Sequence, residues 1–185
     1  MSEPARHQFT VDDYHRMAEA GVLGADDRVE LIQGEIVKRS PIGNRHAGCV
    51  MRVDRFFQQR LGTQAIVWVQ NPVRVSDLSE PQPDVALLRL RSDDYTTANP
   101  TPADVLLVVE VADATAAWDR DVKLPLYATA GIAEAWLVDL SAGVVEARTE
   151  PAVGGYGQMR RLGSGRSLAP LALPEAALSI DDLLA

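Results

Sequence analysis

Residues 104–140 read DVLLVVEVADATAAWDRDVKLPLYATAGIAEAWLVDL, and this segment is the clearest indication of the fold class. Its opening run, DVLLVVEVA, is rich in valine and leucine, which is typical of a strand buried on both faces. A helical stretch follows over residues 116–130 and ends at Gly131. Pro125 inside that stretch predicts a kink or the start of a new helix. AEAWLVDL is then a second strand, and the order strand, helix, strand indicates an α/β protein.

Shorter elements precede this stretch. Thr10, followed by acids in the next turn, predicts the start of a helix that Gly21 ends. The run RVELIQGEIVKR predicts a β-hairpin with Gln33 and Gly34 in its two-residue turn. Apolar side chains then recur at helical spacing over residues 45–61, which predicts a second, longer helix.

Short strands make up most of the remaining chain. AIVWVQ, PVRV and PDVALLRL are predicted as strands before this segment, and VVEARTE and GYGQMRRL as strands after it. The final SIDDLLA predicts a short helix capped by Ser179. This order predicts an α/β fold (α+β with a mixed central sheet), with flanking helices and an N-terminal helix plus β-hairpin.

The composition is that of a folded globular protein. Of the 185 residues, 46% are hydrophobic and 24% are charged, so we expect a single domain over residues 1–185. No apolar run is long enough to span a membrane, and no secretory signal is expected. Cys49 is the only cysteine, which excludes an internal disulfide and a multi-cysteine zinc site. These features favour a cytoplasmic location.

The charge limits the partners. A net charge of −8 repels phosphate backbones, because nucleic-acid affinity depends on neutralising phosphates. A nucleic-acid partner therefore requires a local basic patch or a divalent metal. Only Lys38 and Lys123 are lysines among 18 basic residues. Lysine is a compact charge whose pKa shifts readily, so both positions are of interest.

Glu110 is the anomaly of the central strand. A buried carboxylate must be paired, hydrogen-bonded or metal-bound, because otherwise it stays protonated at a cost in free energy. Either Glu110 emerges into solvent at the strand end, or it is a site acid where open α/β sheets bind ligands. Asp84 follows Pro83 at the entry to another strand, which by itself is common. Together, Asp84 and Glu110 could converge on a hard cation such as magnesium.

Lys123 has two interpretations. Helical spacing aligns it with Asp119 and Tyr127, although Pro125 weakens that alignment. In the first interpretation, Lys123 pairs with Asp119 on a solvated helix face. In the second, its ammonium points at the carboxylates, where it orients a water nucleophile or steadies a pentavalent phosphate.

The roles of three further polar residues, Glu30, Glu35 and His46, are undecided at this point. A two-residue loop pairs Glu30 with Val37 and Glu35 with Ile32, so both acids lie on one face of the hairpin. The sequence does not decide which acid is solvated and which is functional. His46, near the start of the second helix, is a base, a phosphate contact or a helix cap.

These segments together resemble the Uma2 family over about residues 10–140. The resemblance rests on RVELIQGEIV, the helix with His46, PQPDVALL, LLVVEV and DRDVKLPLYATAGIAEAWLVD. The last segment is the most specific, because six residues match the family in order and spacing: Asp119, Lys123, Tyr127, Gly131, Trp136 and Asp139. The resemblance implies a bacterial protein with the restriction-endonuclease-like PD-(D/E)xK fold.

The resemblance also implies roles for the site residues. It implies three metal ligands, namely Asp84, Glu110 and the carbonyl of Val111. It makes Lys123 the catalytic lysine, and the family's N-terminal acid falls on Glu30, which we expect to reach the metal through water. The standard motif has its lysine two residues after the acid, where this chain has Ala112. Lysines that have migrated to the following helix are familiar in this fold, so the departure does not exclude catalysis.

We therefore expect a nuclease-like enzyme that uses magnesium or manganese to hydrolyse phosphodiester bonds in nucleic acid. No GxGxxG, Walker, GxSxG or HExxH motif points to other chemistry. One rival is a catalytically degenerate nuclease fold that serves as a binding or assembly module. Another is a metal-dependent hydrolase of a small phosphorylated or nucleotide substrate.

The arginines separate these alternatives. A stripe of arginines near the acids would favour a polynucleotide substrate, and scattered arginines would favour the two rival functions. The stripe would include four arginines of the second helix, namely Arg45, Arg52, Arg55 and Arg60. We also expect a homodimer, because an exposed sheet edge and nuclease folds that cut two strands both favour pairing.

Overall fold

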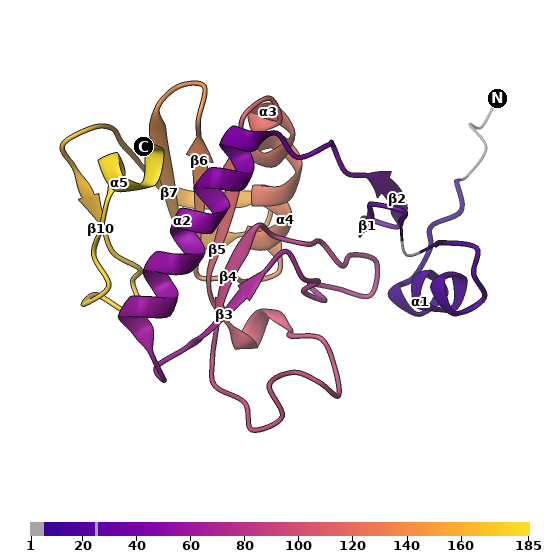
Figure 1. Cartoon of the computed structure of the whole chain (residues 1–185). Helices are drawn as coiled ribbons and strands as arrows, with labels where there is room; N and C mark the ends of the chain where they lie inside the picture. The colour runs from indigo at the N-terminus through magenta and orange to yellow at the C-terminus, as the bar shows by residue number, and fades with distance from the viewer. Residues whose placement is uncertain (1–5, 25) are drawn as a thin grey trace.

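The structure, a computed structural model, describes residues 6–24 and 26–185. Its centre is a six-stranded sheet of order β3-β4-β5-β6-β7-β8 (Figure 1). The strands are β3 (Ile66–Val69), β4 (Val85–Leu88), β5 (Val105–Ala112), β6 (Glu134–Asp139), β7 (Val144–Ala152) and β8 (Gly155–Leu162). β5 and β6 are parallel, and the other neighbouring strands are antiparallel. The predicted α/β fold with a mixed sheet is confirmed.

Helices cover both faces of this sheet (Figure 1). One face packs against α2 (Asn44–Leu61) and the C-terminal α5 (Ile180–Leu184), and the other packs against α4 (Leu124–Thr129). Side chains alternate along a strand. Val109 of β5 therefore faces α2, whereas Val108 and Glu110 face α4.

The crossover between β5 and β6 contains a widened helical turn. It consists of α3 (Ala116–Trp118), the π-helical η2 (Asp119–Lys123) and α4. The Leu124 N–H donates to the Asp119 carbonyl, five residues back instead of four. Pro125 lies in the first turn of α4, where its missing N–H breaks no helical bond. The helix was expected to kink at Pro125 or to begin anew there; instead α4 begins at Leu124 and continues directly from the widened turn.

The N-terminal part of the chain lies beside the sheet (Figure 1) and forms α1 (Val11–Glu19), β1 (Val29–Ile32) and β2 (Glu35–Lys38). The Thr10 hydroxyl accepts a hydrogen bond from the Asp13 N–H at 3.1 Å, as expected of a cap. In the hairpin turn, Gln33 and Gly34 have φ values of 51° and 79°, both left-handed, as a two-residue turn requires. Ile32 pairs with Glu35, so the predicted register is confirmed.

The structure corrects one predicted strand and adds a ribbon. PVRV does not join a sheet, because Pro72 has no N–H and the amides of Val73 and Val75 bond to the carbonyls of Pro81 and Ser79. A short two-stranded ribbon near the C-terminus was not predicted; its strands are β9 (Ser167–Leu168) and β10 (Leu178–Ser179). Elsewhere in the chain, the short helix η1 (Pro102–Asp104) precedes β5. Within the described residues, every helix is too short or too polar to cross a membrane.

Replacement of Gly34 by alanine tests the hairpin turn. A left-handed residue other than glycine costs about 1–2 kcal/mol, so Gly143→Ala, at φ 64° in open space, sets the baseline loss. Gly34→Ala should lose more, because its Cβ would lie only 2.6 Å from the Cβ of Gln8. Urea denaturation of both variants measures the free energy of unfolding, and equal losses would contradict the described contact between Gln8 and the turn.

Candidate active site

Glu110 is the centre of a buried polar cluster between β5 and the crossover helices. Its Oε1 accepts a hydrogen bond from the Tyr127 hydroxyl at 2.6 Å and contacts the Lys123 Nζ at 2.8 Å. Only 3% of the Glu110 side chain is exposed, so the interpretation as a solvent-facing strand end is wrong. Burial, with smaller effects of nearby acids, raises the pKa of Glu110 to about 8, while Lys123 acts in the opposite direction.

Asp84 lies directly before β4 and is held from several sides. Its Oδ2 accepts a hydrogen bond from the Val111 N–H at 2.9 Å and lies 3.0 Å from His46 Nε2. Its Oδ1 accepts a bond from Gln70 at 3.2 Å and lies 3.9 Å from Arg39. Burial opposes its ionisation, but the bond with His46 and the charges around it lower the pKa of Asp84 below its ordinary value. Asp84 is therefore a carboxylate at neutral pH.

Lys123 points into the same cluster. Its Nζ lies 2.8 Å from Glu110 and 3.6 Å from Glu30, and only 5% of its side chain is exposed. The interpretation of Lys123 as a partner of Asp119 on a solvated face is therefore wrong. Burial disfavours its charge, but the surrounding carboxylates raise the pKa of Lys123, so the ammonium stays protonated.

Tyr127 and Asp119 complete the helical side of the cluster. Burial and the neighbouring Glu110 raise the pKa of Tyr127 well above its ordinary value, so its hydroxyl remains a donor. The Asp119 carboxylate is buried and accepts a hydrogen bond from the Thr115 hydroxyl at 2.9 Å. Burial also raises the pKa of Asp119. Lys123 and Tyr127 thus both contact the Oε1 atom of Glu110.

The two acids of the hairpin, Glu30 and Glu35, lie in different environments. Glu30 is buried, and its Oε2 accepts a hydrogen bond from the Gln82 N–H at 3.0 Å besides the contact with Lys123. Glu35 has a side chain that is 63% exposed and lies 3.5 Å from Arg6. The structure therefore brings Glu30 into the site and leaves Glu35 outside it.

His46 enters the site from the first turn of α2. The residue that caps this helix is Gly43, so the interpretation of His46 as a cap is wrong. Its Nδ1 is buried and has no hydrogen-bond partner among the described residues. Because the Asp84 carboxylate can only accept hydrogen bonds, His46 Nε2 donates to it and orients it.

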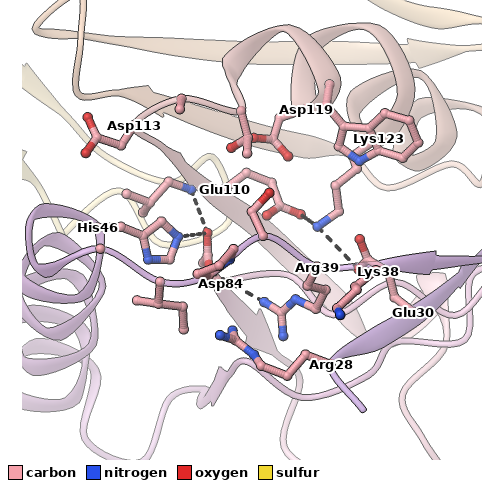
Figure 2. A pocket seen from close by; sticks show the side chains of 18 of the residues that line it. Arg28, Glu30, Lys38, Arg39, His46, Asp84, Glu110, Asp113, Asp119 and Lys123 are labelled. Carbon is pink, nitrogen blue, oxygen red and sulfur yellow. Dashed lines mark hydrogen bonds and ion pairs between the residues drawn. The ribbon is translucent and has the colours of Figure 1, made fainter. Parts of the chain in front are cut away.

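Most of the side chains of this cluster line one open cavity of about 580 Å³: Glu30, His46, Asp84, Glu110, Asp119 and Lys123. Figure 2 shows Asp84 and Glu110 near its middle, with Arg28, Lys38 and Arg39 on one side of them. The buried carboxyl groups of this cavity face the buried Lys123 ammonium and the partly buried Arg39 guanidinium. These carboxyl groups belong to Glu30, Asp84, Glu110 and Asp119. Such an excess of buried negative charge requires protons or a cation.

The donor set fits a hard divalent cation that keeps part of its water shell. Within residues 6–24 and 26–185, no three His, Cys, Asp or Glu side chains form a preformed metal cluster. Magnesium, however, is commonly bound through one or two carboxylates with several waters. Asp84 and Glu110 offer those carboxylates, and Val111, whose carbonyl is the expected third ligand, also lines the cavity.

The arginines of α2 do not form a stripe beside the acids. Arg52 and Arg60 donate to main-chain carbonyls of the C-terminal segment at 3.2 Å, and Arg55 borders a separate hollow next to that segment. Arg45 pairs with Asp113 at 2.8 Å. The cavity instead receives its cations from the hairpin and its flanks, through Arg28, Lys38 and Arg39. The stripe that would favour a polynucleotide does not form on α2, and the placement of these four arginines favours the rival functions.

Sequence reasoning missed several residues of this site. Arg39 and Gln70 contact Asp84, and Lys38 lines the cavity. The rarity of lysine singles out Lys38, one of only two in the chain, but it assigns that residue no role in the site. Gln70 gave no signal, because a glutamine at the end of a strand is ordinary.

The comparisons with known proteins agree with this architecture. The family model for Uma2, described as "Putative restriction endonuclease", matches residues 11–181. The chain belongs to the Uma2 family. A crystal structure of "a putative nuclease belonging to DUF820" from Anabaena variabilis ATCC 29413 is similar over 95% of this chain and 97% of that chain, with 16% identity and a TM-score of 0.74. At that identity the likeness shows the fold, and it confirms the expected nuclease fold for this Uma2 protein. No curated protein matches the chain.

Glu110→Gln tests the charge balance of the cavity in chelator. Since the folded-state pKa of Glu110 lies above the ordinary value of 4.5, the folded state holds the extra proton between the two values. Its contribution to stability is lost as pH rises from about 5 to about 8, by at most about 1.4 kcal/mol per pH unit.

Urea denaturation across that pH range should show a flatter profile for Glu110→Gln than for wild type. Above about pH 8, where Glu110 is ionised, Glu110→Gln should be neutral or stabilising, since it removes a buried charge at nearly constant shape. Glu35→Gln, which changes an exposed acid of the β1–β2 hairpin, should keep the wild-type profile. A Glu110→Gln profile that is parallel to wild type would contradict the assignment.

Proposed function

We propose that this Uma2 protein is a divalent-metal-dependent nuclease that hydrolyses phosphodiester bonds in nucleic acid. The observation that carries the proposal is the 2.8 Å contact between the buried Lys123 ammonium and Glu110, in a cavity that also contains Asp84. The lysine reaches the acid from the crossover helix instead of from position 112, where the strand has alanine. This placement supports catalysis by a chain that lacks the lysine of the standard motif.

Some residues of the site would bind a metal, and others orient the metal ligands. Asp84 and Glu110, with the Val111 carbonyl, would bind magnesium or manganese, and Glu30 would contribute through water. When bound, such a cation polarises the scissile phosphate and lowers the pKa of the attacking water. His46 orients Asp84, and Tyr127 orients Glu110.

Lys123 acts as a proton-bearing donor and not as a base, because its raised pKa keeps it charged at neutral pH. In hydrolysis the water oxygen bonds to phosphorus, the bond from phosphorus to the sugar oxygen breaks, and that oxygen takes up a proton. The Lys123 ammonium orients the water or stabilises the negative charge that grows on the phosphate oxygens.

One observation favours a second candidate function. A cavity of about 580 Å³ has the size of a small-molecule site, and the net charge of −8 does not attract a long polyanion. A metal-dependent hydrolase of a small phosphorylated or nucleotide substrate is the alternative. The degenerate binding or assembly module has less support, since the site keeps both acids and a buried lysine. The homodimer and the cytoplasmic location remain predictions.

Replacement of Lys123 by methionine separates an enzyme from a binding module. Removing a charge-stabilising donor should lower turnover by about 10²–10³-fold with little change in metal affinity. Lys123→Arg should not restore full activity, because a planar guanidinium differs from a compact ammonium. The measurement is manganese-dependent cleavage of single- and double-stranded DNA and RNA.

The matched control is Arg161→Met, which removes an exposed positive charge from β8 and should leave cleavage unchanged. Cleavage that survives unchanged in Lys123→Met would remove this lysine from the mechanism. A lack of cleavage of every polynucleotide by wild type, with metal demonstrably bound, would favour the small-substrate enzyme or the inactive module.

Asp84→Asn tests the metal assignment without any substrate. Magnesium or manganese should raise the melting temperature by binding the folded state, by the equivalent of about 2.7 kcal/mol at 100 times its Kd. Asp84→Asn should abolish that rise, and Asp182→Asn on the exposed face of α5 should keep it. Equal metal affinities of wild type and Asp84→Asn in a calorimetric titration would contradict the assignment.

A further inference from the structure

The rim of the cavity carries exposed side chains that the proposed chemistry does not use. Trp118 of α3 and Ile42, before α2, line the cavity with residue exposures of 40% and 39%. Arg28 and Lys38 line it as well, and both are exposed. The buried acids therefore lie deeper than a rim that combines apolar and basic groups.

Trp118 differs from the other two tryptophans. Trp136 is fully buried in the core, and Trp68 packs edge-on against Tyr95 and donates its indole N–H to a main-chain carbonyl. Trp118 is exposed next to Asp119, which lines the same cavity. An indole held at the mouth of an acid-lined cavity offers a flat face on which a nucleobase can stack.

The basic residues of the rim are also available to a ligand. Within the described part of the chain, neither Arg28 nor Lys38 takes part in an ion pair, and Figure 2 shows no dashed line at either side chain. Other surface arginines are engaged, as in the pair of Arg45 with Asp113 at 2.8 Å. Arg28 and Lys38 lie close together, because the Arg39 N–H bonds to the Arg28 carbonyl and Lys38 pairs with Val29. They form a local pair of cations on the hairpin.

These groups fit unpaired nucleotides better than a duplex. In a duplex the bases are stacked on each other, and the faces that an indole would contact are covered. A duplex site also relies on many phosphate contacts, whereas the arginines Arg52 and Arg60 are bound to the C-terminal segment. One aromatic face with a small number of free cations is the combination that binds single strands.

We propose that the cavity rim binds a single-stranded segment of nucleic acid, with an unpaired base stacked on Trp118 and the adjoining phosphates on Arg28 and Lys38. This inference rests on the proposed nuclease function and names its substrate class. The backbone then crosses the mouth of the cavity, with the scissile phosphate directed toward Asp84 and Glu110. DNA and RNA share this chemistry, so the experiment includes both.

Binding is measured by fluorescence anisotropy with labelled oligothymidylate and oligouridylate of ~12 nucleotides and with a duplex of the same length. The buffer contains chelator, so that binding is observed without cleavage. Both single strands should bind more tightly than the duplex. Trp118→Ala should weaken binding by about 5- to 100-fold, and Trp118→Tyr should retain most of it.

Two further readouts separate stacking from a structural effect. Intrinsic tryptophan fluorescence should be quenched by the oligonucleotide in wild type, and Trp118→Tyr should bind without that quenching. Arg28→Ala and Lys38→Ala should each lower the salt dependence by about 0.7 in the slope of log K against log salt. Leu171→Ala and Arg161→Ala, exposed elsewhere on the surface, should match wild type.

The outcomes distinguish this inference from the proposed function. Tighter duplex binding, no binding of any polynucleotide, or unchanged binding by Trp118→Ala would overturn the inference. If wild type then still cleaves duplex DNA with manganese, the nuclease proposal stands without it. Single-strand binding that depends on Trp118, without cleavage of any polynucleotide, supports the inference as a binding site and overturns the nuclease proposal.

Discussion

The buried contact between the Glu110 carboxyl and the Lys123 ammonium organises the site. Glu110 lies within a strand whose other residues are apolar, and only 3% of its side chain is exposed. Its partners are the Lys123 ammonium at 2.8 Å and the Tyr127 hydroxyl at 2.6 Å. Buried ion pairs contribute little to stability compared with apolar residues of the same volume. The reason to keep this one is therefore chemical, and the surrounding elements are arranged to hold it.

That constraint accounts for the unusual parts of the fold. The π-helical turn before Pro125 directs the side chain of Lys123 toward β5, and widened turns of this kind are frequent at functional sites. The hairpin delivers Glu30 to the other side of the ammonium, at 3.6 Å. With Asp84 and Asp119 also buried, negative charge exceeds positive charge in the cavity, which prepares it for a cation and, through that cation, for a phosphate.

Local signals made most of the fold predictable. The Gln33-Gly34 turn determines the hairpin register, and the apolar strand with its single acid marks the centre of the sheet. The environments of Lys123, Glu30 and Glu35 could not be predicted, because burial there depends on segments far apart in the sequence. The placement of the α2 arginines could not be predicted for the same reason, since the C-terminal segment that binds Arg52 and Arg60 folds back from more than a hundred residues away.

The most direct test is the anomalous diffraction of a crystal of the wild-type protein containing manganese. An anomalous peak should lie within coordination distance of an Asp84 oxygen and a Glu110 oxygen, with Lys123 still in contact with Glu110. The absence of a peak at this position under saturating manganese, or a peak only at surface carboxylates, would contradict the assignment of Asp84 and Glu110 as metal ligands.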